Sequence, residues 1–307
     1  MTAEALPLRA LAPAKINLGL FVGPTREDGR HELVSVMQSI SLADELTLQS
    51  APPGAEGDEV VCEGVVGENL ASRALALFRD ATGWEGWVRL TIDKRIPVAA
   101  GLGGGSADAA ATLRLARVAS GLGDDDLLFV LARELGADVS AQVLPGRWLA
   151  SGVGDVLEEL PDPVSPFGVL VLPQAGGLST AEVYATADRL GGARDSYFLQ
   201  ERHHALRGAL ELGAAVPGDA CLLDNDLQRA SVELCPPIEQ ALGQARDAGA
   251  DMAFVSGSGP TVVGLFTRAN GLVRAQRAAA GLHGREPTPL VGEPVGADFA
   301  RVQRLGT

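Results

Sequence analysis

Residues 97–110 read P-V-A-A-G-L-G-G-G-S-A-D-A-A, and this stretch decides how the rest of the chain is interpreted. Before it, residues 88–93 alternate apolar and polar side chains, which predicts a half-buried strand. After it, residues 107–119 contain nothing that opposes a helix, and alanine is the strongest helix former. A strand, a glycine-rich loop and the start of a helix therefore follow one another. The free amides at a helix start attract anions, and glycine lets the backbone approach phosphate oxygens closely.

The glycine stretch has a simpler interpretation, a flexible connection whose helix is capped by Ser106. Four glycines in five positions, Gly101 and 103–105, favour a phosphate-binding loop instead. Two familiar phosphate loops are excluded. No lysine follows the glycines, as the G-x-x-x-x-G-K-[ST] loop requires. Residues 124–135 have a helical pattern and supply no second strand that ends in an acidic ribose ligand, which disfavours a dinucleotide-binding fold and an NAD-type oxidoreductase.

The length of the chain favours two domains, and the strand and helix patterns of its second half are of the α+β type. A chain of 307 residues is long enough for two sizeable cores, and with 46% hydrophobic but only 4% aromatic residues these cores should be aliphatic. Residues 146–166 are rich in proline and glycine and form the candidate boundary. We expect an N-terminal domain over 1–160, which contains the phosphate loop, and a C-terminal domain over 161–307. The second half mixes strands and helices, with a second glycine loop at 256–260 between two strands.

The charge and cysteine content exclude several classes of partner. A net charge of −14 argues against nucleic acid or an anionic membrane, whereas a local group of amides still holds phosphate in an acidic protein. No window of 18 apolar residues and no signal-peptide pattern occurs. The three cysteines lack C-x-x-C spacing, so we expect neither a disulfide framework nor a zinc site, and no set of metal ligands is evident. These features indicate a cytoplasmic protein.

Lys15 and Asn17 lie on one side of a predicted strand at 14–22, whose apolar residues face the other side. Their side chains should be roughly 6 to 7 Å apart. A solvated strand face explains one lysine well, but the chain has only two lysines, Lys15 and Lys94, among its 25 basic residues. A compact point charge at each position therefore suggests a specific role.

Two further polar residues leave alternatives open. Asp138 follows Gly136 at the end of a predicted helix, so it either caps the next helix or acts as a catalytic carboxylate. His31 comes just after the strong Asp28-Gly29 turn signal, and a lone histidine there is usually a surface or packing residue.

The sequence resembles the GHMP kinase superfamily at three motifs in the expected order: A-P-A-K-I-N-L at 12–18, residues 97–110, and S-G-S-G-P-T-V at 256–262. Six shorter motifs are similar to the branch that phosphorylates the 2-hydroxyl of a cytidine diphosphate-linked methylerythritol in non-mevalonate isoprenoid synthesis: K-I-N-L (15–18), D-G-R-H-E-L (28–33), E-N-L (68–70), D-K-R-I-P (93–97), L-G-A-D-V (135–139) and D-N-D (224–226). The resemblance implies an N-terminal domain like ribosomal protein S5 domain 2, a ferredoxin-like C-terminal domain, and ATP in the cleft between them. Its rivals are a homoserine, mevalonate or sugar kinase of the same superfamily, and a nucleotide-binding module without transfer activity.

The resemblance also implies roles for particular residues. Lys15 and Asp138 match the catalytic pair, in which the aspartate accepts the hydroxyl proton and the lysine steadies it and the transferred phosphoryl group. The implied ATP site, with Mg²⁺ expected alongside the nucleotide, comprises Asn69 and Lys94 beside the adenine, with Pro97, Gly101, Gly103, Gly104, Gly105 and Ser106 around the phosphates. The implied substrate site comprises Asn17, His31, Thr180 and Tyr184, of which the tyrosine would stack on cytosine. Arg30 stands where relatives commonly have a second ring, and a guanidinium also stacks on flat rings.

Overall fold

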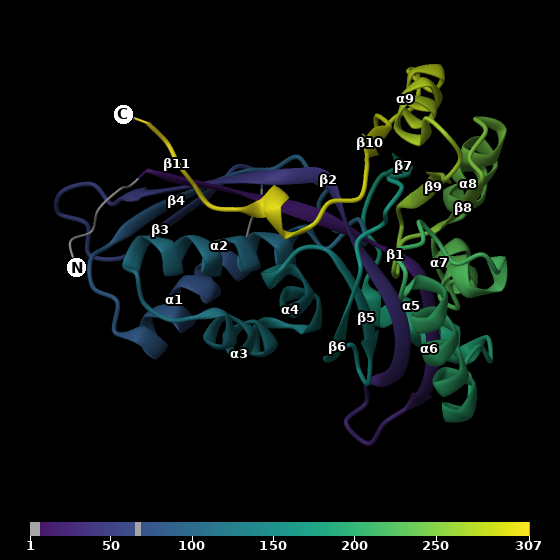
Figure 1. The fold of residues 1–307 in the computed structure, drawn as a ribbon, viewed down its shortest axis with the longest axis horizontal. Helices are drawn as coiled ribbons and strands as arrows, with labels where there is room; N and C mark the ends of the chain where they lie inside the picture. The colour runs from purple at the N-terminus through teal and green to yellow at the C-terminus, as the bar shows by residue number, and fades with distance from the viewer. Residues whose placement is uncertain (1–6, 65–68, 307) are drawn as a thin grey trace.

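A computed structural model describes residues 7–64 and 69–306, so Glu68 of the E-N-L motif lies outside the described residues. The chain forms a seven-stranded and a four-stranded sheet, which lie beside each other in Figure 1. Helices cover both sheets, which confirms the α+β class. Within 7–64 and 69–306, no helix combines the length and the apolar character needed to cross a membrane.

The first sheet is built on one long hairpin. Strand β1 (Leu8–Thr25) pairs antiparallel with β2 (His31–Ser50), and Gly29 with φ +79° lies in the predicted turn between them. Both strands are longer than their sequence patterns predicted, because register shifts after Pro13 and Asn17 let the ladder continue through irregular positions. The sequence predicts two separate strands at 33–40 and 45–48, and in the structure both are parts of the single strand β2.

The other strands of this sheet come from separate parts of the chain. They are β3 (Glu59–Cys62), β4 (Val88–Asp93), β5 (Arg147–Ser151), β6 (Val156–Leu160) and β11 (Gln303–Arg304). The order is β11-β1-β2-β4-β3, with β5 paired to both β2 and β6. Strand β4 is the strand predicted before the glycine loop. The β5–β6 hairpin lies inside the proline- and glycine-rich stretch 146–166, so only residues 161–167 separate it from the second sheet.

Four helices cover one face of the first sheet (Figure 1). They are α1 (Leu70–Thr82), α2 (Gly104–Ser120), α3 (Asp125–Leu135) and α4 (Ala137–Val143). Their ends largely follow the sequence signals: Asn69 caps α1, Asp124 caps α3, and α3 ends at Gly136 as predicted. The core between helices and sheet is made mainly of leucine, alanine and valine, in line with the aliphatic cores that the composition predicted.

The second sheet is antiparallel in the order β10-β7-β9-β8. Its strands are β7 (Gly168–Leu172), β8 (Met252–Val255), β9 (Val262–Phe266) and β10 (Leu290–Gly292), and the second glycine loop joins β8 to β9 as predicted. The helices of this half are α5 (Thr180–Arg189), α6 (Ser196–Leu210), α7 (Gln228–Leu234), α8 (Pro237–Asp247) and α9 (Gly271–Gly281), with short 3-10 turns η1 (Ala220–Leu223) and η2 (Ala297–Ala300). Helix α6 packs against β1 and β2, and one apolar core contains residues of both sheets.

Candidate active site

The glycine loop ends in a helix start with free backbone amides. Gly103, with φ +69°, occupies the cap position of α2 and supplies no side-chain hydrogen bond. Ser106 lies inside the first turn of the helix, so the expectation that Ser106 caps it is wrong. The first amides of a helix have no partner within the helix. Residues 104–106 therefore present donors at the positive end of α2, which suits an anion.

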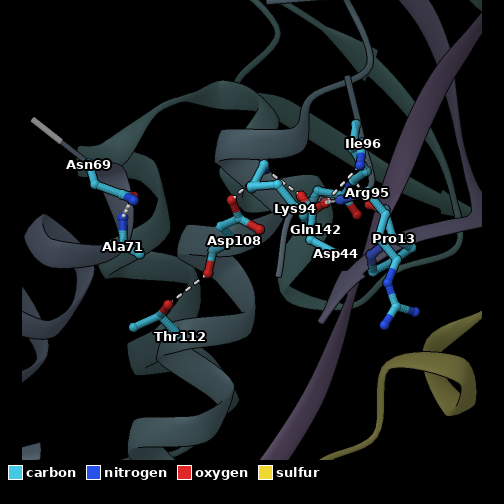
Figure 2. Close-up of polar contacts among 10 residues, drawn as sticks. All are labelled: Pro13, Asp44, Asn69, Ala71, Lys94, Arg95, Ile96, Asp108, Thr112 and Gln142. Carbon is cyan, nitrogen blue, oxygen red and sulfur yellow. Dashed lines mark hydrogen bonds and ion pairs between the residues drawn. The ribbon is translucent and has the colours of Figure 1, made fainter. Parts of the chain in front are cut away.

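All eight residues expected around ATP line one cavity of about 340 Å³. They are Asn69, Lys94, Pro97, Gly101, Gly103, Gly104, Gly105 and Ser106. We call this the nucleotide cavity. Asn69 reaches it from the start of α1, where its Oδ1 accepts a hydrogen bond of 2.9 Å from the amide of Ala71 (Figure 2).

A second cavity, of about 310 Å³, shares Gly101 and Gly103 with the first. Its wall includes Lys15, Asn17, Asp138, Thr180 and Tyr184, and we call it the acceptor cavity. The glycine loop therefore forms a common wall between two cavities, with its backbone exposed to both.

Lys15 connects the strand and helix sides of the acceptor cavity. Its Nζ donates to Asn17 Oδ1 at 2.8 Å, so the two side chains lie on the same side of β1 as predicted. The same nitrogen lies 3.5 Å from Asp138 Oδ2. The side chain of Lys15 is only 9% exposed, and its stem packs on the glycine loop, where a β-carbon at Gly103 would lie 2.9 Å from Lys15 Cγ.

Asp138 does not cap α4. The cap position is occupied by Gly136, and Asp138 lies in the first turn with a side chain that is 44% exposed. Among the described residues, the contact with Lys15 is the one polar contact of its carboxylate. The capping interpretation of this aspartate is therefore wrong, and its carboxylate is accessible from the acceptor cavity.

The remaining substrate candidates differ in position. Thr180 Oγ1 lies 3.1 Å from Ser258 Oγ of the second glycine loop, at the wall of the acceptor cavity. His31 is not part of that wall. Its ring lies 4.9 Å from the Tyr184 ring, and its Nε2 lies 2.8 Å from Asp188 Oδ1. It therefore contacts the tyrosine without lining the cavity.

Tyr184 and Arg30, the two residues that the resemblance placed beside cytosine, have different surroundings. Burial, together with the charge of Asp138, raises the pKa of Tyr184 to about 12, so its phenol is neutral at physiological pH. Arg30 is largely exposed and bonds the carboxylate of Asp28 at the turn between β1 and β2.

Comparisons with known proteins identify the family of the chain. Two family models match the chain: the GHMP kinases N terminal domain over residues 69–146 and the GHMP kinases C terminal domain over residues 202–283. A 4-diphosphocytidyl-2-C-methyl-D-erythritol kinase of Arthrobacter sp. (strain FB24) is 40% identical over 95% of both chains. The chain belongs to the 4-diphosphocytidyl-2-C-methyl-D-erythritol kinase family of GHMP kinases.

Other relatives of this GHMP kinase support the same assignment. A kinase of the same name from Nocardioides sp. (strain ATCC BAA-499 / JS614) is 40% identical over 89% of this chain and 92% of its own. The crystal structure of a 4-(cytidine 5'-diphospho)-2C-methyl-D-erythritol kinase superposes with a TM-score of 0.76 at 36% identity, covering 93% of this chain and 98% of that one. A homoserine kinase from Cytophaga hutchinsonii also reaches 0.76, covering 99% of this chain and 98% of its own, but at 17% identity it shows the shared GHMP kinase fold alone.

Sequence reasoning missed an ion-pair cluster in this GHMP kinase (Figure 2). Lys94 contacts Asp44 of β2 and donates to Asp108 Oδ2 of α2 at 2.8 Å. Burial opposes the charge of the lysine, but the two carboxylates outweigh that effect and raise the pKa of Lys94. Lys94 lies in the D-K-R-I-P motif and Asp108 in G-G-G-S-A-D-A-A, so these two motifs could have indicated a charged cluster. Asp44 lies in no such motif, and a single sequence does not reveal that it belongs to the cluster.

Sequence reasoning also assigned no role to Asn225 of the D-N-D motif. Its side-chain amide donates to the carbonyls of Val255 and Gly257, both at 2.8 Å, and so holds the second glycine loop of the GHMP kinase in place. That loop contacts the first one, because a β-carbon at Gly101 would lie 2.5 Å from the carbonyl oxygen of Ser256. Asn225 therefore supports the loop that Thr180 meets at the acceptor cavity.

Proposed function

We propose that this chain transfers the γ-phosphoryl group of ATP to the 2-hydroxyl of 4-diphosphocytidyl-2-C-methyl-D-erythritol, a step of the non-mevalonate isoprenoid pathway. The names of the relatives at about 40% identity and of the matching crystal structure support this substrate. The nucleotide cavity would hold ATP, and the acceptor cavity would hold the cytidylyl substrate.

One observation carries the proposal: the Lys15–Asp138 contact lies in the acceptor cavity, next to the glycine loop that both cavities share. A phosphoryl group bound by the backbone amides of residues 103–106 would therefore be transferred past Lys15 toward Asp138. The reaction needs an aligned nucleophile and neutralised phosphate charge rather than covalent help from the protein. Here Lys15 would supply a compact positive charge on the transferred group.

The proton and bond changes balance across these groups. Asp138 would accept the proton of the substrate hydroxyl as its oxygen forms a bond to the γ-phosphorus. The bond from that phosphorus to the β,γ-bridging oxygen would break, leaving ADP with both electrons of that bond. The free α2 amides and Lys15 would stabilise the phosphate oxygens throughout. A base placed in this way contributes about 10²- to 10⁴-fold in rate.

We expect Mg²⁺ to reach this site as a companion of the nucleotide. In 7–64 and 69–306, no three His, Cys, Asp or Glu side chains converge as a metal cage. Mg²⁺ in kinases keeps waters and takes phosphate oxygens together with one or two carboxylates, so it needs no such cage. When bound, the ion would neutralise charge on the phosphates.

The remaining expectations extend this proposal. We infer that Asn17, Thr180 and Tyr184 bind the cytidylyl substrate, with His31 acting through the tyrosine, and that the protein works in the cytoplasm on small molecules. With domains over 1–160 and 161–307, the acceptor cavity would lie between them, because Thr180 and Tyr184 of its wall belong to the second domain. Every residue that lines the nucleotide cavity belongs to the first domain, so the expectation of ATP in a cleft between the domains is not supported by this lining. The aromatic contact of His31 with Tyr184 supports a site for a flat base at this end of the acceptor cavity.

The direct test is ATP consumption with candidate alcohols supplied one at a time. We expect ADP formation with 4-diphosphocytidyl-2-C-methyl-D-erythritol and none above background with homoserine or mevalonate. Protection against heat by a cytidine nucleotide would support the same acceptor. Turnover of homoserine or mevalonate alone would assign the chain to another GHMP kinase activity, and nucleotide binding without turnover of any alcohol would indicate a binding module.

A further inference from the structure

The cluster around Lys94 has one negative charge in excess. Asp44 uses both carboxylate oxygens, since Oδ1 accepts the amides of Arg95 and Ile96 at 2.6 and 2.8 Å and Oδ2 contacts Lys94. Asp108 uses only Oδ2, and its Oδ1 is buried without a hydrogen-bond partner among the described residues. When both carboxylates are ionised, one lysine balances only one of them. The charge that lacks compensation is therefore that of Asp108.

This excess charge lies close to the amides that face the nucleotide cavity. Asp108 is four residues after Gly104 on α2, about 6 Å along the helix, and it lines the same cavity. A β-carbon at Gly104 would lie 3.3 Å from Lys94 Nζ, so the cluster lies directly against the first residue of the helix. A negative charge at this distance in a partly buried wall acts strongly on a phosphate chain.

We propose that Asp108 determines how tightly the nucleotide cavity binds nucleotide: its ionised carboxylate weakens the binding of the phosphate chain, and its uncharged form strengthens it. The inference rests on the proposed function, because it requires a nucleotide in this cavity. Lys94 remains anchored by Asp44 whichever form Asp108 takes, so the effect is one of charge more than of position. A change of about tenfold in affinity is the scale expected for one such charge.

The surroundings of Asp108 make both of its forms accessible. The charged groups that act on it among the described residues are Lys94 and Asp44, and the Cys62 thiol of β3 is the titratable group beside the cluster. Burial raises the pKa of Asp108 to about 7, with Lys94 opposing the rise and Asp44 adding to it. An anionic nucleotide bound nearby raises that pKa further. Nucleotide binding just above neutral pH should therefore be accompanied by proton uptake at Asp108.

The experiment compares ADP binding by calorimetry in the wild type, Asp108→Asn and Asp126→Asn. The control removes the same charge from an exposed position on α3. At pH 7.5 we expect Asp108→Asn to bind ADP about tenfold more tightly than wild type, whereas Asp126→Asn binds as wild type does. Repeating the titration in two buffers of different ionisation enthalpy should reveal proton uptake in the wild type and the control, and none in Asp108→Asn.

A purely structural role of Asp108 predicts the opposite sign, because loss of an ion pair would loosen the loop and weaken binding. Equal or weaker ADP binding by a folded Asp108→Asn would overturn the proposal. If that variant does not fold, the proton uptake of the wild type tests the proposal by itself. ADP binding without proton uptake at pH 7.5 would overturn the role of Asp108 and would not contradict the kinase function. A wild type that binds neither ADP nor ATP would contradict the proposed function itself.

Discussion

The ammonium nitrogen of Lys15 lies 3.5 Å from Oδ2 of Asp138, although one residue belongs to the first strand and the other to the fourth helix. Both residues line the acceptor cavity, beside the part of its wall that the glycine loop forms. Lys15 is held by Asn17 and packed against Gly103, while the carboxylate of Asp138 is half exposed. The lysine is therefore fixed in place and the aspartate is free to meet a ligand.

Replacing the carboxylate by an amide tests the role of Asp138. We expect Asp138→Asn to lower turnover about 10²-fold or more, because an amide cannot accept the hydroxyl proton. The melting temperature should stay near that of wild type, since this side chain caps no helix and is 44% exposed. Steady-state kinetics and a melting curve on the same preparation measure both. A folded variant with normal turnover would remove Asp138 from the mechanism.

Lys15→Arg tests whether the exact position of the positive charge at residue 15 matters, in addition to the charge itself. The site is 9% exposed and the lysine stem packs against the glycine loop, so a larger planar guanidinium should displace Asp138 or the loop. We expect a loss of turnover of at least tenfold with the positive charge retained, which corresponds to about 1.4 kcal/mol of transition-state stabilisation. Arg89→Lys, a change at a half-exposed position on β4 that also keeps the positive charge, is the control and should leave turnover unchanged. Unchanged turnover in Lys15→Arg would show that any cation suffices.

Two neighbouring glycines should respond in opposite ways to alanine. Gly103 has φ +69°, and a β-carbon there would lie 2.9 Å from Lys15 Cγ, so Gly103→Ala should cost about 1–2 kcal/mol of stability and weaken ATP binding. Gly105 lies in the first turn of α2, and its β-carbon would meet nothing closer than 3.9 Å, so Gly105→Ala should raise stability by up to about 1 kcal/mol. Denaturant unfolding measures both changes. Equal effects of the two substitutions would contradict the close contact of loop and lysine.

Tyr184 is expected to act through its ring. Tyr184→Phe should leave kinetics near wild type, whereas Tyr184→Ala should raise the KM for the cytidylyl substrate about tenfold and leave the KM for ATP unchanged. A large loss in Tyr184→Phe would assign the role to the hydroxyl instead.

The same residue predicts a pH effect on stability. Burial, aided by Asp138, raises the pKa of Tyr184 to about 12, above the value of about 10 for an unfolded chain. A raised folded-state pKa gives stability that is present below pH 10 and is lost as the pH rises toward 12. Wild type should therefore lose more unfolding free energy than Tyr184→Phe over this window. Parallel losses in the two proteins would contradict a buried phenol.

Local patterns in the sequence predicted the glycine loop, the strand before it, the helix after it, and the shared side of Lys15 and Asn17, because each depends on residues close in the chain. The contact of Lys15 with Asp138 depends on how β1, α2 and α4 pack, and only the resemblance to a family suggested it. The same limit explains the errors. Ser106 looked like a cap because its type favours that position, but Gly103 already occupies it with a positive φ. Asp44 carried no local signal, since its partners Lys94, Arg95 and Ile96 lie far along the chain, on the loop after β4.

The most direct measurement of the central claim is phosphorus NMR of 4-diphosphocytidyl-2-C-methyl-D-erythritol incubated with ATP, Mg²⁺ and either wild type or Asp138→Asn. The account predicts a new phosphomonoester resonance on the methylerythritol, growing in step with ADP in the wild type and absent with the variant over the same time. Formation of that resonance at equal rates by both proteins, or ATP cleavage in the wild type that releases only inorganic phosphate, would contradict it.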